Sequence, residues 1–332
     1  MSPRTDRTKP LPWEPPGPMP EGARSWRVTD AERLEREWVE LRRSISEHAE
    51  KERFLQVWLK ERARRFAIET GQIEGLYTLK PGITEQLVVE GFASVAGTDA
   101  YESLGDEELR GLLEDQEAAY QMMREDTAAG QELRLFAIKE WHGLLTRNQA
   151  AVAGVTQGGR RVQVPFERKG TWKRKPNTTV MPDGATLEYC PPEHVQSEME
   201  RLVEMYKEIE SQDYPAHVEA AWLHHRHVRI HPFEDGNKRT GRLLMARCYL
   251  RRGLPPPVLA ARDRPDYFDA LARAHRGDLR PLAEHLEVAA FQTLNTAVRL
   301  ARDVVDGYLH RPNGNGGRTS GDTYYPPMES SG

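Results

Sequence analysis

The chain has 332 residues, of which 38% are hydrophobic and 30% are charged, and its formal net charge is −4. This length is sufficient for two lobes, and the slight acidity disfavours a general nucleic-acid-binding role, which requires a basic surface. Two cysteines, no long apolar run and no signal-peptide pattern predict a protein of the reducing cytoplasm, with neither a disulfide framework nor a membrane span.

The first part of the chain is predicted to be a disordered tail followed by a helical lobe. Residues 1–25 contain seven prolines, which disfavour regular structure. From residue 28 onward, acidic and basic residues alternate around an apolar stripe, which is typical of one long, partly exposed helix that Gly75 ends. With further helical patterns at 84–94 and 105–125, the predicted lobe covers residues 26–132.

The second part is predicted to be a helical domain over residues 133–310, with one small β-hairpin. Two short strands flank a Pro-Asp-Gly turn at residues 182–184. A tail rich in Gly, Asn, Ser and Pro, predicted to be disordered, covers residues 311–332. The fold class is therefore all-α, and the expected helices of this part cover residues 131–147, 193–211, 216–229, 237–252, 264–275 and 279–309.

The run HPFEDGNKRTGR, at residues 231–242, is the segment most indicative of chemistry. Pro232 disfavours the helical conformation at His231, so the preceding helix is expected to end there. Asn237 is suited to the start of a new helix, where unpaired backbone N–H groups attract anions. Two arginines follow, three residues apart on one helix face. We therefore expect a phosphate-binding site beside the His231 imidazole.

This run resembles the Fic family pattern H-x-F-x-(D/E)-G-N-G-R-x-x-R, and it departs from it only at Lys238, where the family usually has glycine. Residues 138–145 resemble the first core helix of that family, and residues 266–282 resemble its closing helices. The resemblance covers roughly residues 133 to 300. It implies a Fic-type helical bundle with a β-hairpin flap and an N-terminal helical lobe. It also implies an enzyme that transfers AMP from ATP to a Ser, Thr or Tyr hydroxyl of a target protein.

The resemblance also implies roles for individual residues. His231 would take the proton from the target hydroxyl, and Asp235 would hold Mg²⁺, which prefers oxygen ligands. ATP would be the co-substrate. The implied nucleotide-binding residues are Gly236, Asn237, Lys238, Arg239, Arg242 and Tyr267. The implied flap residues are Arg160, Gln163 and Val164, together with Gly159, and an extended segment of the target would add to the edge of this flap as a further strand. From its position alone, Tyr267 is equally compatible with a packing role.

A second motif, TGQIEG at residues 70–75, resembles the inhibitory (S/T)-x-x-x-E-(G/N) motif of Fic enzymes. By that resemblance Glu74 would pair with Arg242 and occupy the guanidinium intended for the γ-phosphate, so the enzyme would be nearly silent as purified. In some family members the same glutamate is implied to orient water for removal of the modification. The alternative is a solvated Glu74 carboxylate directly before the Gly75 helix cap.

Lys238 leaves two other functions open. The Doc branch of the superfamily has Asn-Lys-Arg at this place and transfers the γ-phosphate, whereas Gly236 and Arg242 favour AMP transfer. If Lys238 instead prevents the productive nucleotide pose, the chain would be a non-catalytic, Fic-like adaptor. The target protein, a different nucleotide donor and the oligomeric state stay open.

Two further patterns have plain alternatives. Histidines 224, 225, 227 and 231 could suggest zinc, but Pro232 interrupts the helix at the last of them, so core or surface histidines are favoured. The basic segment 168–175 contains Trp172 and could bind nucleic acid or an acidic target, but a solvated loop tip is the default expectation.

Overall fold

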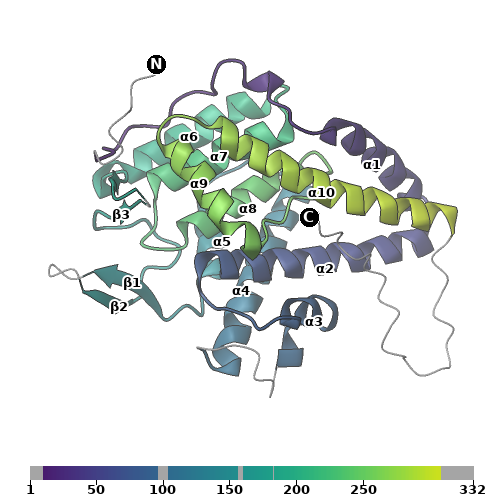
Figure 1. The fold of residues 1–332 in the computed structure, drawn as a ribbon, viewed down its shortest axis with the longest axis horizontal. Coiled ribbons are helices and arrows are strands. Elements are labelled where there is room, and N and C mark those ends of the chain that lie inside the picture. Colours follow the sequence, from purple (N-terminus) through teal and green to yellow (C-terminus); the bar gives the residue numbers. More distant parts are fainter. Residues whose placement is uncertain (1–9, 96–103, 156–159, 182, 308–332) are drawn as a thin grey trace.

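The computed structural model describes residues 10–95, 104–155, 160–181 and 183–307. Its fold class is all-α, as predicted, with two small β-hairpins (Figure 1). The predicted tail at 311–332, residues 1–9, Gly159 and the turn residue Pro182 lie outside the described residues. The helices are α1 (Ala31–Ser46), α2 (Ala49–Glu74), α3 (Ile83–Glu90), α4 (Asp106–Ala128), α5 (Leu135–Leu145), α6 (Val195–Glu210), α7 (Ala216–Ile230), α8 (Asn237–Leu250), α9 (Arg264–His275) and α10 (Arg280–Asp306).

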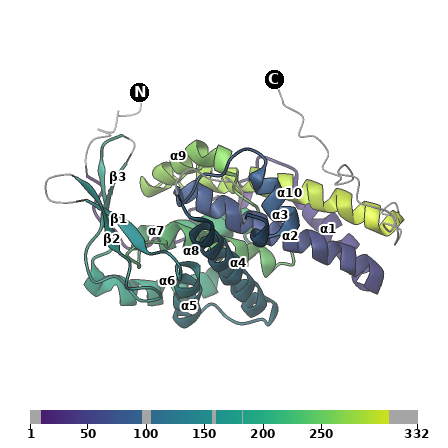
Figure 2. The same ribbon diagram turned by 90° about the horizontal axis from the view of Figure 1, so that it is seen from below.

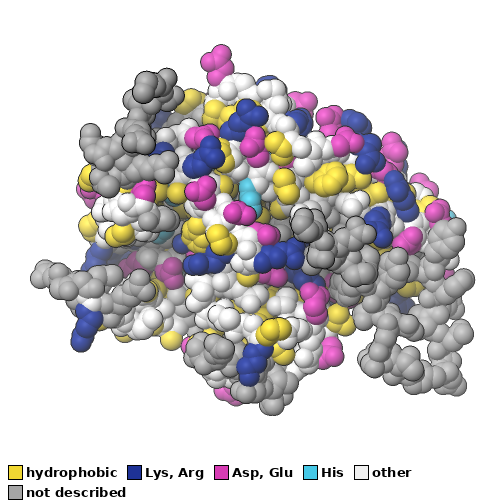
Figure 3. Space-filling model, in the orientation of Figure 1, with side chains coloured by type: hydrophobic (Ala, Val, Ile, Leu, Met, Phe, Trp, Pro, Cys, Tyr) yellow, Lys and Arg dark blue, Asp and Glu magenta, His cyan; other side chains and the backbone are white. Residues whose placement is uncertain are grey.

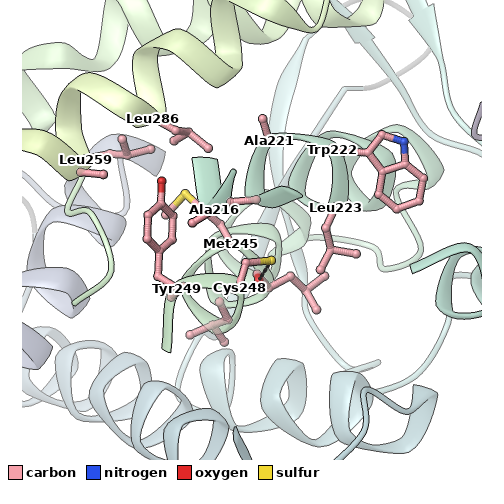
Figure 4. Packing of buried hydrophobic residues seen from close by; sticks show 14 of the residues in the cluster. Ala216, Ala221, Trp222, Leu223, Met245, Cys248, Tyr249, Leu259 and Leu286 are labelled. Carbon is pink, nitrogen blue, oxygen red and sulfur yellow. Dashed lines mark hydrogen bonds between the residues drawn. The ribbon is translucent and has the colours of Figure 1, made fainter. Parts of the chain in front are cut away.

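The centre of the fold is the pair α7 and α8, which pack against each other along their length. Almost every residue of α7 is buried, on all sides of the helix, which is typical of a helix enclosed by other elements. Figure 4 shows Met245 and Tyr249 of α8 on the side of Leu286 of α10, with Trp222 of α7 at the other side of the same core cluster. The loop between α7 and α8 is thus held between two rigid, buried helices.

The expected single helix before Gly75 is instead two helices, α1 and α2. The chain turns at His48, which has extended backbone angles of φ −130° and ψ 108°. The turn lets α1 pack along α10, where Trp38 is buried and donates a hydrogen bond to the carbonyl of Gly253 (2.9 Å). Gly75 ends α2 with φ 71°, as predicted, so Glu74 occupies the last helical position.

The strands form two antiparallel hairpins rather than one. The predicted hairpin pairs β3 (Thr178–Val180) with β4 (Thr186–Glu188). A second hairpin pairs β1 (Ala151–Val155) with β2 (Arg161–Pro165), in a register that places Val152 opposite Val164. Both hairpins lie at the same end of the molecule (Figure 2).

The expectation of disorder over residues 1–25 is wrong for residues 10–25. The backbone N–H of Leu11 donates to Thr186 of β4 (2.8 Å), and Leu11 accepts from the N–H of Glu188 (2.9 Å). The Trp222 indole of α7 donates to the carbonyl of Gly17 (3.2 Å). Proline removes only the N–H donor, so this proline-rich segment still offers carbonyls that the neighbouring elements use.

No helix among the described residues is long and apolar enough to cross a membrane. On the face seen in Figure 3, basic and acidic side chains are interspersed over the helices.

Candidate active site

The loop between α7 and α8 has a backbone conformation that few residues adopt. His231 follows the last residue of α7 with φ 54° and ψ 58°, and it is the one non-glycine residue with positive φ in the described ranges. Gly236 has φ 75° directly before α8. The side-chain amide of Asn237, the first residue of α8, closes the loop, because its Oδ1 accepts from the N–H of Phe233 and its Nδ2 donates to the Phe233 carbonyl (2.9 Å each). Asn237 therefore fixes the turn that presents His231.

The His231 imidazole is held in one tautomer. Its Nδ1 lies 3.2 Å from the carbonyl of Val228, which can only accept, so Nδ1 carries the proton and Nε2 keeps a lone pair. Burial lowers the pKa of His231 well below its ordinary value of 6.5, and the nearby Lys238 and Lys173 lower it further. The ring is therefore neutral near neutral pH, which is the form that a general base requires.

Two buried guanidiniums lie on α8 behind this loop. Arg239 and Arg242 are each 1% exposed. Arg239 donates from one terminal nitrogen to the Oε1 of Gln149 (2.5 Å), and that nitrogen lies 3.4 Å from the Asp235 carboxylate. Its other terminal nitrogen, Nη1, is buried without a hydrogen-bond partner among the described residues. A buried donor without a partner costs free energy unless a ligand pairs with it.

Asp235 has one oxygen engaged and a partly exposed side chain. Its Oδ2 accepts from the Nε2 of Gln149 (2.6 Å), while 42% of the side chain is exposed. Burial raises the pKa of Asp235, but Arg239 and Gln149 outweigh it and lower the pKa below its usual value. The carboxylate therefore stays ionised.

Glu74, at the end of α2, closes the site from the N-terminal lobe. Its carboxylate lies 2.8 Å from Arg242 and 3.0 Å from the Nζ of Lys238, and its side chain is 12% exposed. Burial alone would raise the pKa of Glu74, but Lys238 and Arg242 lower it to about 2. The alternative of Glu74 as a solvated carboxylate is therefore wrong, and the Lys238 side chain is held in an ion pair.

Tyr267 of α9 lies beside Arg242, inside the core. Its hydroxyl is 2.8 Å from the Nε2 of His224 and 3.3 Å from a terminal nitrogen of Arg242, and the side chain is fully buried. These contacts place Tyr267 behind the guanidinium. Contact with a base or ribose stays a prediction.

The flap residues lie on the β1–β2 hairpin. Gln163 and Val164 are in β2, opposite Ala153 and Val152, and Arg160 directly precedes that strand. Val164 is largely exposed, as an edge available to an added strand would be. Binding of a target by these residues stays a prediction.

The basic segment 168–175 is not a solvated loop tip throughout. Lys173 is buried, and its N–H donates to the carbonyl of Pro232 (2.8 Å). Gly170 has φ +66° and approaches α5 so closely that a Cβ there would meet the carbonyl of Lys139 at 3.0 Å. This glycine lets the segment pack against α5 and the His231 loop, while Arg174 and Lys175 stay exposed.

Three supporting residues could not be recognised in the motif. Gln149 bridges Asp235 and Arg239, as described above. His142 of α5 accepts from the N–H of Gly170 at Nδ1 (2.9 Å), so its Nε2–H donates to the carbonyl of Asp235 (2.9 Å). Tyr189, directly after β4, stacks on His231. The only signal for His142 was a polar residue on the apolar side of a short helix.

Two of the histidines that suggested zinc have hydrogen-bonding partners, and His227 packs against Phe233. His224 contacts Tyr267, and the Nε2 of His225 lies 3.1 Å from the Nδ1 of His275. No group of three or more metal-ligating side chains occurs in the part of the chain that the structure describes. These contacts agree with core histidines.

Residues 133–249 match the sequence profile of the Fic/DOC family. The chain is 42% identical to the Protein adenylyltransferase Fic of Nematostella vectensis over 76 residues. This aligned segment is 23% of this chain and 18% of that protein. The chain is 30% identical to the Protein adenylyltransferase fic-1 of Caenorhabditis elegans over 139 residues. This aligned segment is 42% of this chain and 26% of that protein. The matched part is thus about a quarter or less of these relatives' lengths.

Two solved structures have the same fold. A Fic domain containing signaling protein from Bacteroides thetaiotaomicron superposes with a TM-score of 0.65 at 21% identity, covering 82% of this chain and 98% of that one. Fic-1 from Caenorhabditis elegans gives a TM-score of 0.60 at 19% identity, covering 82% and 73%. The chain therefore carries a domain of the Fic/DOC family, matched over residues 133–249.

Proposed function

We propose that this chain is an autoinhibited enzyme that transfers AMP from ATP to a Ser, Thr or Tyr hydroxyl of a target protein. The observation that carries the proposal is the pairing of a base with an anion site. His231 keeps a lone pair on Nε2, at a helix start whose buried Arg239 has an unpartnered donor. The relatives named adenylyltransferases support the choice of reaction.

The proposed reaction begins when the neutral His231 accepts the hydroxyl proton of the target at Nε2. The hydroxyl oxygen then forms a bond to the α-phosphorus of ATP, and the bond from that phosphorus to the bridging oxygen of the β-phosphate breaks. Pyrophosphate leaves, and AMP stays on the target. The backbone amides at the start of α8, together with Arg239 and Arg242, hold the phosphates and the charge that develops on them.

Asp235 fits a magnesium ion that ATP brings with it. Mg²⁺ is usually bound by one or two carboxylates, with substrate phosphates and water completing its six oxygen ligands. Asp235 is ionised, has Oδ2 fixed by Gln149 and is partly exposed, so it would provide that carboxylate. When bound, the ion would supply positive charge to the phosphates.

Glu74 would hold the enzyme in a low-activity state. Its carboxylate takes up Arg242 and Lys238, the two cations that would otherwise pair with the outer phosphates of ATP. A nucleotide must therefore displace a buried ion pair before it binds in a productive pose. Release of Glu74 frees both cations, so activity should depend on this one carboxylate. In this arrangement both carboxylate oxygens are engaged, so we do not assign Glu74 to removal of the modification.

Lys238 keeps γ-phosphoryl transfer as a second candidate. Its Nζ lies 3.0 Å from Glu74, in the first turn of α8, so a released Lys238 adds a cation where glycine is usual in the family. The resulting pose decides which phosphorus faces the target oxygen.

We place the reaction in the cytoplasm, because Cys190 and Cys248 are both free thiols in the structure.

The test uses the full chain with Glu74→Gly, incubated with cell extract and either α-labelled or γ-labelled ATP. The matched control is the Glu74→Gly, His231→Ala double variant. Protein labelling from the α position alone, lost in the double variant, supports AMP transfer through His231. Labelling from the γ position alone means a kinase. No labelling from either position, together with no ATP binding by calorimetry, supports the adaptor.

A further inference from the structure

We propose that Tyr189 is a positioning residue for His231: its ring fixes the imidazole plane and stabilises the imidazolium that forms as His231 takes the proton. This inference rests on the proposed function. It assigns a role to the β3–β4 hairpin, which the motif at residues 231–242 does not include.

The geometry is a parallel stack of two rings. The Tyr189 and His231 ring centroids are 3.8 Å apart, with an interplanar angle of 16°. Tyr189 is 9% exposed, and its hydroxyl donates to the Oγ1 of Thr179 on β3 (3.0 Å). The phenol is therefore fixed at its hydroxyl end and lies against the imidazole, and the Nζ of Lys173 is 5.8 Å from the centroid of the Tyr189 ring.

The imidazole needs such a contact. His231 lies outside α7 in the left-handed region, and the structure records one hydrogen bond for its ring, from Nδ1 to Val228. A single hydrogen bond at one edge leaves the ring free to rotate about that edge. The Tyr189 face blocks this rotation, so Nε2 keeps the direction in which it accepts the proton.

The charges around His231 oppose its protonation. Burial is the largest cause of the lowered pKa of His231. Lys238 of α8 and Lys173 of the loop before β3 lower this pKa further, and the buried His227 of α7 has the same effect. The Val228 carbonyl acts in the opposite direction. The face of an aromatic ring carries negative partial charge and attracts a cation. Tyr189 therefore offsets part of the cost of forming the imidazolium.

The hairpin that carries Tyr189 is itself anchored. Arg229 of α7 donates to the carbonyls of Glu188 and Pro12, and Leu11 exchanges backbone hydrogen bonds with β4. The N-terminal segment thus holds the end of β4 against α7. This arrangement fixes the distance between Tyr189 and the residue that follows α7.

The test compares Tyr189→Phe with Tyr189→Leu, both in the Glu74→Gly background. Phenylalanine keeps the stacked ring and loses only the hydroxyl, whereas leucine removes the aromatic face. We expect kcat to stay within about twofold for Tyr189→Phe and to fall about tenfold for Tyr189→Leu, with KM for ATP little changed. Loss of the aromatic face also lowers the pKa of His231, so the acidic limb of the pH–rate profile should move to lower pH in the leucine variant.

A second measurement needs no activity and leaves Tyr189 in place. In the unmodified full chain, the ring current of Tyr189 should shift the Hε1 proton of His231 upfield in the NMR spectrum, with the signal assigned by its loss in His231→Ala. If no variant transfers AMP, the proposed function fails, and this shift still tests the stack. Equal kcat in the leucine and phenylalanine variants, or no upfield shift in the unmodified chain, would overturn the proposal.

Discussion

Replacing Glu74 by glutamine removes the one carboxylate that Lys238 and Arg242 share, with almost no change of shape. Arg242 is 1% exposed, so its charge would stay buried without a carboxylate beside it. The lowering of the pKa of Glu74 from 4.5 to about 2 corresponds to roughly 3 kcal/mol of folding stability at neutral pH. Breaking buried ion pairs typically costs about 3 to 5 kcal/mol. We therefore expect the free energy of unfolding to fall by about 3 kcal/mol.

The pH dependence of this term follows from the direction of the shift. Because the pKa of Glu74 is lower in the folded chain, its stabilisation is fully present above pH 4.5 and is lost as the pH falls through about 2. The difference in the free energy of unfolding between the chain with Glu74 and the Glu74→Gln variant should therefore be constant near neutral pH and become smaller in acid. The ion pair would thus keep Glu74 in place at any physiological pH.

The assay is urea unfolding with and without Mg-ATP. The matched control is Glu108→Gln, a neutralisation on the exposed surface of α4, which should change stability by less than about 0.5 kcal/mol. ATP should stabilise Glu74→Gln more than it stabilises the unmodified chain, because its phosphates replace the missing carboxylate. A loss of stability no larger than that of the control, or equal ATP affinity in both chains, would contradict the shared ion pair of Glu74.

Four further outcomes are expected. In the Glu74→Gly background, His231→Ala should abolish labelling while ATP affinity by calorimetry is largely kept; an active alanine variant would contradict the base assignment. Lys238→Gly should raise basal labelling, though less than Glu74→Gly does, because Arg242 still holds Glu74; unchanged basal activity would contradict the shared ion pair. Gln149→Leu should raise the Mg²⁺ concentration needed for half-maximal rate, because Asp235 loses its donor; an unchanged Mg²⁺ titration would exclude that role. The labelling rate of Glu74→Gly should stay at its plateau as the pH falls below 6.5, because the pKa of His231 is lowered. A decline of this rate centred at or above pH 6.5 would contradict the lowered pKa of His231.

The features of the fold that could be predicted are those set by local chemistry. Gly75 ends α2 because glycine adopts the left-handed conformation without strain, and Pro232 excludes the helical conformation at the preceding residue. The turn at His48 has no such local signal, because it is set by the packing of α1 on α10. The ordered segment at residues 10–25 was missed for the same reason: its hydrogen-bond partners are far away in the sequence.

The site divides in the same way. The run at residues 231–242 contains the base, the loop and both arginines, because one turn between two helices brings them together. Their supports come from elsewhere: Gln149 and His142 lie some 90 residues earlier in the chain, and Tyr189 comes from a hairpin. None of these contacts leaves a periodic or spacing signal. The pairing of Lys238 with Glu74 likewise depends on how α2 meets α8.

The proposed function requires that this site join the target oxygen to the α-phosphorus of ATP. The most direct measurement is the identity of the small product released as Glu74→Gly modifies protein, with His231→Ala in the same background as the blank. Pyrophosphate formed in step with modified protein is the predicted result. ADP in its place would mean that the γ-phosphorus is attacked, and neither product above the blank would mean that the site performs no transfer.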